Sequence, residues 1–226
     1  MQSWNDLKSE IKEWIVRSAE TPFLSALKNE LKECGSVLEV GSGIHSQIGK
    51  VPRKFYLEGI DLLPIKKNKK LWIHDAYKKG DIRNLRKYYK NSSFDAVIAI
   101  DVIEHLTKKD GFRLLDDMEW IARKKIIILT PEGFHVQGTV DGNPFMEHLS
   151  GWSTGEFKKY GYTTHGMHGL KILRGEEASI KYKPWYVWIL VSHLTQYITH
   201  FFPRIAFHII AIKSLPKGKE NTQDLT

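Results

Sequence analysis

The chain has 226 residues, of which 42% are hydrophobic and 27% charged, as expected of a soluble globular protein with one domain and a sizeable core. Its net charge of +8 comes from 34 Lys and Arg against 26 Asp and Glu, and much of the excess lies in short runs such as 66–70, which are more typical of a solvated surface than of a nucleic-acid-binding protein. Cys34 is the only cysteine, so an internal disulfide is excluded, and the N-terminal residues show no secretion signal. We therefore expect a cytoplasmic protein.

Apolar residues recur at helical spacing through residues 3–33, and Thr21–Pro22 interrupts the pattern, so two helices are expected there. The stretch that follows, 36–43, predicts a buried strand that runs directly into a turn with Gly41 and Gly43. Glycine tolerates backbone angles that are closed to other residues and has no side chain, so a ligand can lie directly against such a turn.

A second apolar strand, 55–61, ends in Asp61, twenty residues after Gly41, and a short helix is expected before it, within 44–51. An acid at this spacing from a glycine turn commonly accepts hydrogen bonds from a ribose diol. The two strands together therefore indicate a site for a nucleoside cofactor.

The third strand has two candidate positions, 71–75 ending in Asp75 and 76–81 ending in Asp81. The remaining apolar segments predict strands and helices in alternation, at 93–101, 108–123, 125–130, 153–160, 162–168 and 205–213. This order predicts an α/β fold with a doubly wound, mostly parallel sheet of seven strands, in which ligands bind beyond the carboxyl ends of the strands. The glycine turn and the acids that end the strands are expected to line one cleft.

The glycine turn departs from the dinucleotide-binding pattern, because Ser46 stands where that pattern has its third glycine. A nicotinamide-dependent oxidoreductase is therefore an alternative that we do not favour. Six segments instead resemble, in register, the motifs of class I S-adenosylmethionine-dependent methyltransferases of the type 11/12 methyltransferase domain. These segments are 37–43, 59–62, 80–82, 93–97, 100–106 and 129–131.

The resemblance implies a single methyltransferase domain over residues 1–226. Within it, N-terminal helices would occupy 1–33, the cofactor-binding core 34–168, a helical insertion or lid 170–203, and the last strand 204–213. Gly41, Ser42 and Gly43 would wrap the amino-acid end of the cofactor, S-adenosylmethionine, and Glu39 would support the turn. His45 stands at the usual third glycine of the family, so the loop is expected to differ in shape there.

The resemblance also implies how the nucleoside is held. Asp61 would bind the ribose hydroxyls, and Leu62 would pack on the adenine. Asp81 would accept a hydrogen bond from the adenine amino group, with Ile82 lining the same slot. Asp75 competes for the adenine role, but the spacing of Asp81 to the next strand is closer to that of the family, so we expect Asp75 to be structural.

The chemistry is expected near the end of the fourth strand, where the resemblance implies that Asp101 and Val102 line the methionine portion of the cofactor. Methyl transfer from a sulfonium is an in-line displacement, so alignment of the reactants is the main requirement. An oxygen nucleophile often needs a base as well, and histidine suits that role near neutral pH. His105 is the first candidate base, His148 the second and His135 the third, each with a purely structural role as its alternative.

Asp101, Glu104 and His105 place two carboxylates and an imidazole close together in the sequence. Some related methyltransferases hold a divalent metal with a similar cluster, but nearness in sequence does not define a coordination sphere. We therefore predict no metal ligands and keep a metal site here as a minority hypothesis.

Between Pro184 and Pro203 the chain has no Asp, Glu, Lys or Arg. The polar residues of this segment fall near one helical face, which argues against a simple membrane span and favours an amphipathic helix over 185–202. A lid over the substrate, a homodimer surface, an anchor on a membrane surface and core packing are all open. A lid rich in aromatic residues would favour a lipophilic or aromatic substrate.

The sequence thus predicts S-adenosylmethionine-dependent methyl transfer to a small-molecule acceptor, with an oxygen of a lipophilic or aromatic molecule as the methylated group. A nucleic-acid (RNA) methyltransferase, motivated by the positive charge, is the first alternative. A nicotinamide-binding oxidoreductase and a non-catalytic module with a cofactor fold are the others.

Overall fold

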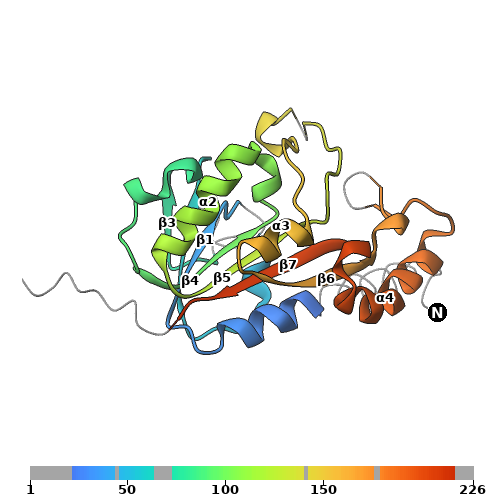
Figure 1. Cartoon of the computed structure of the whole chain (residues 1–226), viewed down its shortest axis with the longest axis horizontal. Coiled ribbons are helices and arrows are strands. Elements are labelled where there is room, and N and C mark those ends of the chain that lie inside the picture. The colour runs from blue at the N-terminus through green and yellow to red at the C-terminus, as the bar shows by residue number, and fades with distance from the viewer. Residues whose placement is uncertain (1–21, 44–45, 64–72, 140–141, 176–178, 217–226) are drawn as a thin grey trace, which may run out of the picture.

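The computed structural model describes residues 22–43, 46–63, 73–139, 142–175 and 179–216. They form a seven-stranded sheet with helices on both faces (Figure 1), which confirms the predicted doubly wound α/β architecture. The strand order is β3-β2-β1-β4-β5-β7-β6, and only β7 runs antiparallel to its neighbours within this described sheet. The strands are β1 (Ser36–Val40), β2 (Tyr56–Asp61), β3 (Ala76–Lys79), β4 (Phe94–Ile100), β5 (Ala122–Pro131), β6 (Thr163–Leu170) and β7 (Ala206–Ser214).

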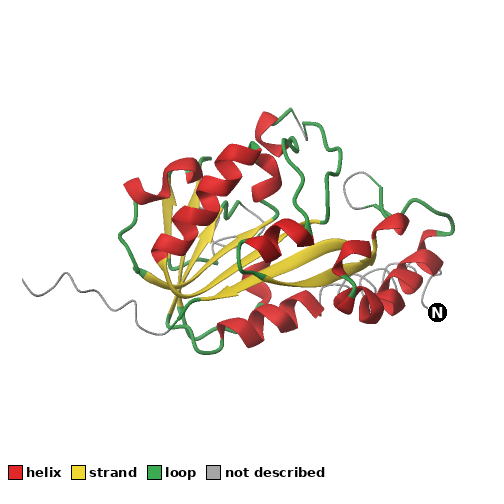
Figure 2. Ribbon diagram, in the orientation of Figure 1, coloured by secondary structure: helices red, strands yellow, loops and turns green. Residues whose placement is uncertain are grey.

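The helices cover both faces of the sheet, as Figure 2 shows. Residues 22–31 form a helix on one face, and α2 (Lys108–Ile121) and α3 (Thr154–Lys159) lie on the other. The helix at 22–31 is the second of the two predicted for 3–33, and the first lies outside the described residues. Short 3-10 helices complete the chain: η1 (Gln47–Lys50), η2 (Ile82–Lys87), η3 (Ile103–His105), η4 (Pro144–Met146), η5 (Lys171–Leu173) and η7 (Pro203–Ile205).

The core has two parts because the strands of the sheet alternate their side chains between its faces. Val37 of β1 packs with the helix at 22–31, whereas Leu38 and Val40 face the cluster under α2 and α3. All three side chains are fully buried. Burial on both faces explains why these strands read as continuous apolar runs in the sequence.

The third strand occupies the second of its two candidate positions, since β3 begins at Ala76. Asp75 directly before it accepts a hydrogen bond from the Leu57 N–H at 2.8 Å, and its carboxylate also pairs with Arg53 at 2.7 Å. These contacts anchor the start of β3, so Asp75 lies at the amino end of the strand and Asp81 beyond its carboxyl end.

The long apolar segment near the C-terminus forms α4 (Trp185–Phe201), which lies between β6 and β7 in the chain and packs against β6, the edge strand of the sheet. In the part of the chain that the structure describes, no helix is long and apolar enough to cross a membrane.

Replacing Leu27 with Ala should lower the free energy of unfolding by about 2–5 kcal/mol, because the Leu27 side chain is fully buried between its helix and the sheet. Urea unfolding followed by circular dichroism measures the change. Lys28→Ala, on the exposed side of the same helix, is the control and should change stability by less than about 0.5 kcal/mol. Equal effects of the two variants would show that this helix does not pack on the core.

Candidate functional site

The parallel strands bring the predicted site residues to one edge of the sheet. Val40, the last residue of β1, pairs with Ile60 of β2 and with Ala99 of β4. The glycine turn directly follows Val40, Asp61 directly follows Ile60, and Asp101 comes two residues after Ala99, so all three emerge beyond the carboxyl ends of adjacent strands.

The turn after β1 is built from two glycines in left-handed conformations, with φ of +67° at Gly41 and +50° at Gly43. The N–H groups of Gly41 and Ser42 both donate to the carbonyl oxygen of Ile60, at 2.9 and 3.2 Å. A Cβ on Gly41 would come within 2.6 Å of Val102, whereas a Cβ on Gly43 would meet nothing within 4 Å among the described residues. The turn is therefore packed on its inner side and open at Gly43.

Asp61 lies directly against this open side of the turn. Its Oδ2 accepts a hydrogen bond from the Gly43 N–H at 2.9 Å, and its Oδ1 accepts one from the Leu63 N–H at 2.8 Å. The side chain of Asp61 is half-buried, as is that of Leu62 beside it. Each carboxylate oxygen keeps a second lone pair with which it can accept a hydrogen bond from a ligand.

A buried network holds the turn from below. The Glu39 carboxylate, 2% exposed, accepts hydrogen bonds from Ser46 Oγ and from His74 Nε2, and the Tyr77 hydroxyl donates to His74 Nδ1. Burial, followed by the negative charge of Glu39, raises the pKa of Tyr77 to about 12. Sequence reasoning found Glu39 but missed His74, which lies just before β3, and Tyr77 within it, because this short strand reads AYKK and carries no apolar pattern.

The surroundings of the Ser42 hydroxyl bear on whether the turn fits a cofactor. Its side chain is 3% exposed, and its Oγ has no hydrogen-bond partner among the described residues. A buried hydroxyl without a partner is costly, and a polar ligand on the turn would supply one. The orphaned hydroxyl and the open space at Gly43 therefore fit a polar group lying across the turn. His45, the predicted departure from the family, lies outside the described residues.

Asp81 follows β3 and begins η2. Its carboxylate accepts hydrogen bonds from the Arg83 N–H at 2.9 Å and from the Arg83 guanidinium at 2.6 Å, and the side-chain hydrogen bond from Arg83 lowers the pKa of Asp81. Ile82 packs against the apolar cluster under α2. Asp81 thus lies at the carboxyl edge of the sheet, where a cofactor would have to share its oxygens with Arg83.

Asp101 directly follows β4 and has a left-handed conformation, with φ of +51°. Its Oδ1 lies 3.2 Å from His208 Nε2, and His208 Nδ1 lies 2.9 Å from His168 Nδ1. Burial works to raise the pKa of Asp101, but the charge and hydrogen bond of His208 outweigh it and leave that pKa lowered. A chain of two imidazoles thus reaches from β7 and β6 to the acid, and sequence reasoning missed it because these residues are far apart in the sequence.

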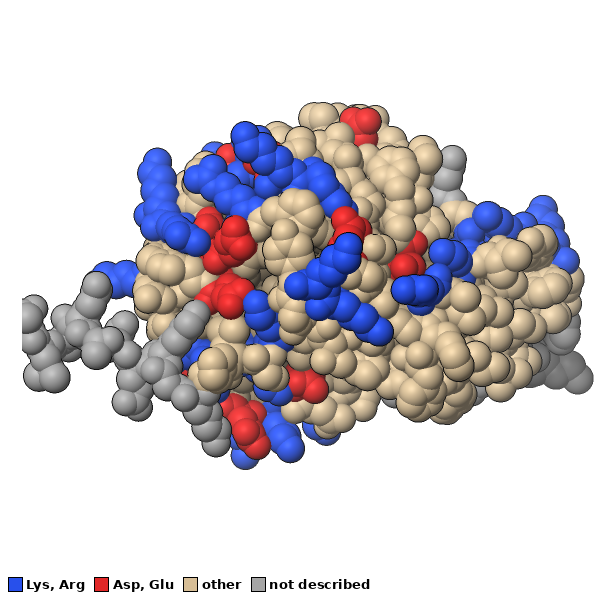
Figure 3. Space-filling model, viewed as in Figure 1, with Lys and Arg blue, Asp and Glu red and all other residues tan. Residues whose placement is uncertain are grey.

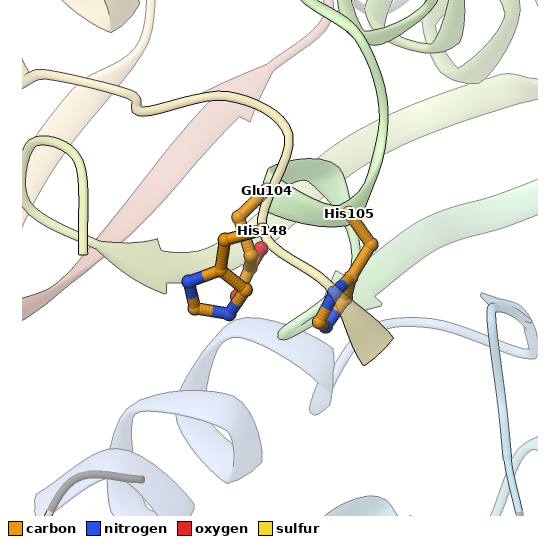
Figure 4. A group of neighbouring side chains, drawn as sticks. All are labelled: Glu104, His105 and His148. Atoms are coloured by element: carbon orange, nitrogen blue, oxygen red, sulfur yellow. The ribbon is translucent and has the colours of Figure 1, made fainter. Parts of the chain in front are cut away.

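Glu104, His105 and His148 lie close together (Figure 4). One ligand atom from each lies within 4.8 Å of the others. Glu104 is 3% exposed and accepts a hydrogen bond from Thr130 Oγ1 at 2.9 Å, while burial and then the charge of Asp101 raise its pKa well above the ordinary value. The structure thus brings together the two histidines predicted as catalytic.

The tautomers of these two histidines follow from their partners. His105 Nδ1 lies 3.1 Å from the Glu147 carbonyl oxygen, and His148 Nδ1 lies 2.7 Å from the His135 carbonyl oxygen. A carbonyl only accepts, so both Nδ1 atoms carry hydrogen and both Nε2 atoms offer a lone pair. Burial lowers the pKa of His105 and of His148, so both rings are neutral near pH 7. His135, the third candidate, positions His148 through its backbone.

The loop after β5 that carries His148 is tied to η3. The N–H groups of Leu149 and Ser150 both donate to the Glu104 carbonyl oxygen, at 2.8 and 3.0 Å. This contact holds His148 against Glu104 and His105, although 43 residues separate the two histidines in the sequence. The arrangement offers either two bases next to a carboxyl group or two nitrogens and an oxygen for a divalent cation.

Comparisons with known proteins place this geometry in context. No family model matches the sequence, and no curated protein matches it. The structure is similar to a SAM-dependent methyltransferase from Archaeoglobus fulgidus (TM-score 0.51, 17% identity, 85% of this chain and 94% of that one). It is also similar to a possible histamine N-methyltransferase from Thermotoga maritima (0.52, 18%, 91% and 95%) and to the small RNA methyltransferase HEN1 (0.51, 14%, 89% and 26%). The chain has the class I S-adenosylmethionine-dependent methyltransferase fold, and at these identities the likeness extends to the fold alone.

The lowered pKa of His168, which lies beside His208, makes the stability of the protein depend on pH. Burial, followed by the charge of His208, lowers the pKa of His168 to about 3, against about 6.5 in the unfolded chain. Between these values the unfolded state binds the proton more tightly, so the free energy of unfolding falls as the pH falls below 6.5. In His168→Asn this loss should be smaller, and urea midpoints at pH 7.5 and 4.5 measure it. Equal losses in both proteins would show that His168 is not protected from protonation.

Proposed function

We propose that the protein is an S-adenosylmethionine-dependent methyltransferase whose acceptor is a small molecule, methylated on an oxygen of a lipophilic or aromatic group. The observation that carries the proposal is the open glycine turn with the Asp61 carboxylate bonded to it, at the carboxyl edge of a class I methyltransferase sheet. The orphaned Ser42 hydroxyl supports a polar ligand at the same turn.

The cofactor would be held by residues from successive strands. Gly41, Ser42 and Gly43 would contact its amino-acid end, and the buried Glu39 network would keep the turn in shape. Asp61 would accept hydrogen bonds from the ribose hydroxyls. Bound there, S-adenosylmethionine supplies a methyl group that is already activated for transfer.

The adenine and methionine portions would be bordered by the other predicted residues. Leu62 would pack on the adenine, and Asp81 would accept from its amino group with the lone pairs that Arg83 leaves free. Asp101 and Val102 would line the methionine end, where Val102 already packs against Gly41.

The protein's own chemistry would come from the two neutral imidazoles. The Nε2 atom of His105 or of His148 can remove the proton from an acceptor hydroxyl while the surrounding residues align that oxygen for in-line attack. The Asp101 carboxylate would stabilise an imidazolium as it forms, because its negative charge favours the protonated form of both rings.

The same three side chains support a second candidate, a methyltransferase in which Glu104, His105 and His148 bind a divalent cation beside the acceptor. Two imidazole nitrogens with their Nδ1–H groups fixed by backbone carbonyls, and one carboxylate, form a donor set of the kind found in metal sites. A cation would also neutralise Glu104, a buried carboxyl group with a raised pKa. It would bind and polarise an acceptor hydroxyl.

An RNA substrate is the weaker alternative. Part of the basic surface is paired with acids, in ion pairs such as Arg86–Asp117 and Lys213–Glu119. Figure 3 likewise shows red and blue side chains interspersed on the face over α2 rather than one basic tract. RNA binding that weakens steeply with salt would favour this alternative.

Isothermal titration calorimetry with S-adenosylhomocysteine tests the cofactor. The wild-type protein should bind it, and Asp61→Ala should weaken binding by about 10- to 150-fold, the effect of losing charge-assisted hydrogen bonds worth about 1.5–3 kcal/mol. Asp116→Ala, an exposed acid on α2, is the matched control and should bind like the wild type. Binding of NADH in place of S-adenosylhomocysteine would select the oxidoreductase, and binding of neither would overturn the proposal.

Titration of the metal-free protein with Mn²⁺, followed by electron paramagnetic resonance, separates the two candidate chemistries. A metal site predicts stoichiometric binding that is lost in His148→Asn and kept in His200→Asn. If a histidine acts as the base instead, no such binding is expected and activity should survive chelation. Activity should then fall only below pH 6.5, because the pKa of both imidazoles is lowered. The acceptor for the pH profile would come from metabolite extracts screened for methyl gain with labelled cofactor. Full activity in His105→Asn and His148→Asn would contradict both candidates.

A further inference from the structure

The helix α4 packs against the sheet with its polar side. Ser192 is 2% exposed and Thr199 is fully buried, although both are polar residues in a helix of mostly apolar composition. Gln196 donates from Nε2 to the Gly166 carbonyl oxygen at 2.9 Å and accepts from the Gly169 N–H at 3.0 Å. Ser192 Oγ also donates to the His168 carbonyl oxygen at 3.1 Å. Hydrogen bonds to the backbone of β6 therefore orient this helix.

The contact is too close for side chains of ordinary size. A Cβ on Gly166 would lie 2.0 Å from the Thr199 carbonyl oxygen, and a Cβ on Gly169 would lie 2.2 Å from that of Ser192. The two glycines of β6 thus let the helix backbone lie directly on the strand. Little room is left on this side for the large apolar residues of the helix.

Those residues instead face outward. Tyr197 is 79% exposed and Phe201 is 76% exposed, whereas the apolar side of a surface helix ordinarily packs on the core. The outer face of α4 consists of the exposed residues Trp185, Tyr186, Val187, Leu190, Leu194, Tyr197, Ile198, Phe201 and Phe202. In Figure 3 the surface over α4, at the lower right, is largely free of charged side chains. Proteins rarely expose so many neighbouring apolar groups without a partner.

Within the segment 179–216, which carries the outer face, the charged residues are of one sign. Residues 179–216 contain no Asp or Glu, while Lys181 and Lys183 precede the helix and Arg204 follows it, all three exposed. A second copy of the chain, bound through a symmetric interface, would place these cations next to the same cations of the partner, and the like charges would repel. Anionic lipid headgroups would attract them.

The composition of the outer face also fits a lipid surface. Aromatic residues with polar tips, such as Trp185, Tyr186 and Tyr197, favour the boundary between headgroups and acyl chains. The 17 residues of α4 span about 25 Å along the helix axis, and their polar side is already bonded to β6, so the helix can lie in the plane of a bilayer but not across it.

We propose that α4 docks the protein on an anionic membrane surface, with its outer face buried among the lipids and Lys181, Lys183 and Arg204 at the level of the phosphates. Residues 194, 197 and 201 also border a cavity of about 810 Å³ between α4 and the helix at 22–31, which His168 lines as well. His168 reaches Asp101 through His208. This arrangement favours a lipophilic acceptor that enters from the bilayer. The inference about the acceptor rests on the proposed function.

Flotation of the full chain with vesicles tests the docking without cofactor or acceptor, so its outcome does not depend on the proposed function. Vesicles of phosphatidylcholine with phosphatidylserine should bind the wild type, and vesicles of phosphatidylcholine alone should bind it more weakly. Tyr197→Ser with Phe201→Ser should weaken binding at least about tenfold. Phe145→Ser with Tyr160→Ser, which removes two exposed aromatic residues outside α4, is the matched control and should bind like the wild type.

A separate variant tests how much the three cations contribute to vesicle binding. Replacing Lys181, Lys183 and Arg204 with Gln should weaken binding to anionic vesicles by about fivefold for each cation, with little change on neutral ones. Circular dichroism confirms that each variant is folded. Equal binding of the wild type and the Tyr197/Phe201 variant would overturn the proposal. An absence of vesicle binding by the wild type would overturn it as well. If light scattering instead shows a dimer that the Tyr197/Phe201 double variant dissociates, the outer face binds a second copy of the chain.

Discussion

The parallel pairing of β1 with β2 on one side and with β4 on the other is the constraint on which the rest of the site depends. Because Val40 is level with both Ile60 and Ala99, the glycine turn and Asp61 leave the sheet at the same height, and Asp101 leaves it one residue later. A slip of one residue in either ladder would turn one of these groups toward the opposite face. The fully buried apolar side chains on both sides of β1 hold this register, so the geometry of the site follows from the packing of the core.

Above that edge the site divides into two regions of different character. Around the turn, backbone N–H groups, the Asp61 carboxylate and the Glu39 network form a fixed cradle in which the polar groups are paired except for the Ser42 hydroxyl. Beside Asp101, in contrast, a buried carboxyl group and two imidazoles present unshared electron pairs toward one another. The first region suits recognition of a ligand, and the second suits proton transfer or cation binding. Only the second depends on a contact between distant segments, the loop carrying His148 and η3.

The fold could be predicted from the sequence to a large extent, because β1, β2, β4 and β5 are short, largely apolar runs that end at glycine, proline or an acid. The ambiguous third strand shows the limit. Both candidates for it end in an acid, and the choice depends on Arg53 and Leu57, which bind Asp75 from a preceding segment. The roles given to the site residues, such as Asp61 and Asp81, remain predictions. His74, His168 and His208 could not be found, since the acid or imidazole that each one contacts is 35 or more residues away and a lone histidine carries no pattern.

The attachment of α4 through Gly166 and Gly169 has a consequence for how the surface of the protein can change over evolutionary time. Since the outer face takes no part in holding the helix to β6, substitutions there escape the selection that maintains the fold. The residue types on the outer face are therefore determined by the surroundings in which the protein works. In a lineage whose surroundings differ, polar residues would replace the aromatic ones first, while the two glycines and the serine, glutamine and threonine that lie against them would be retained.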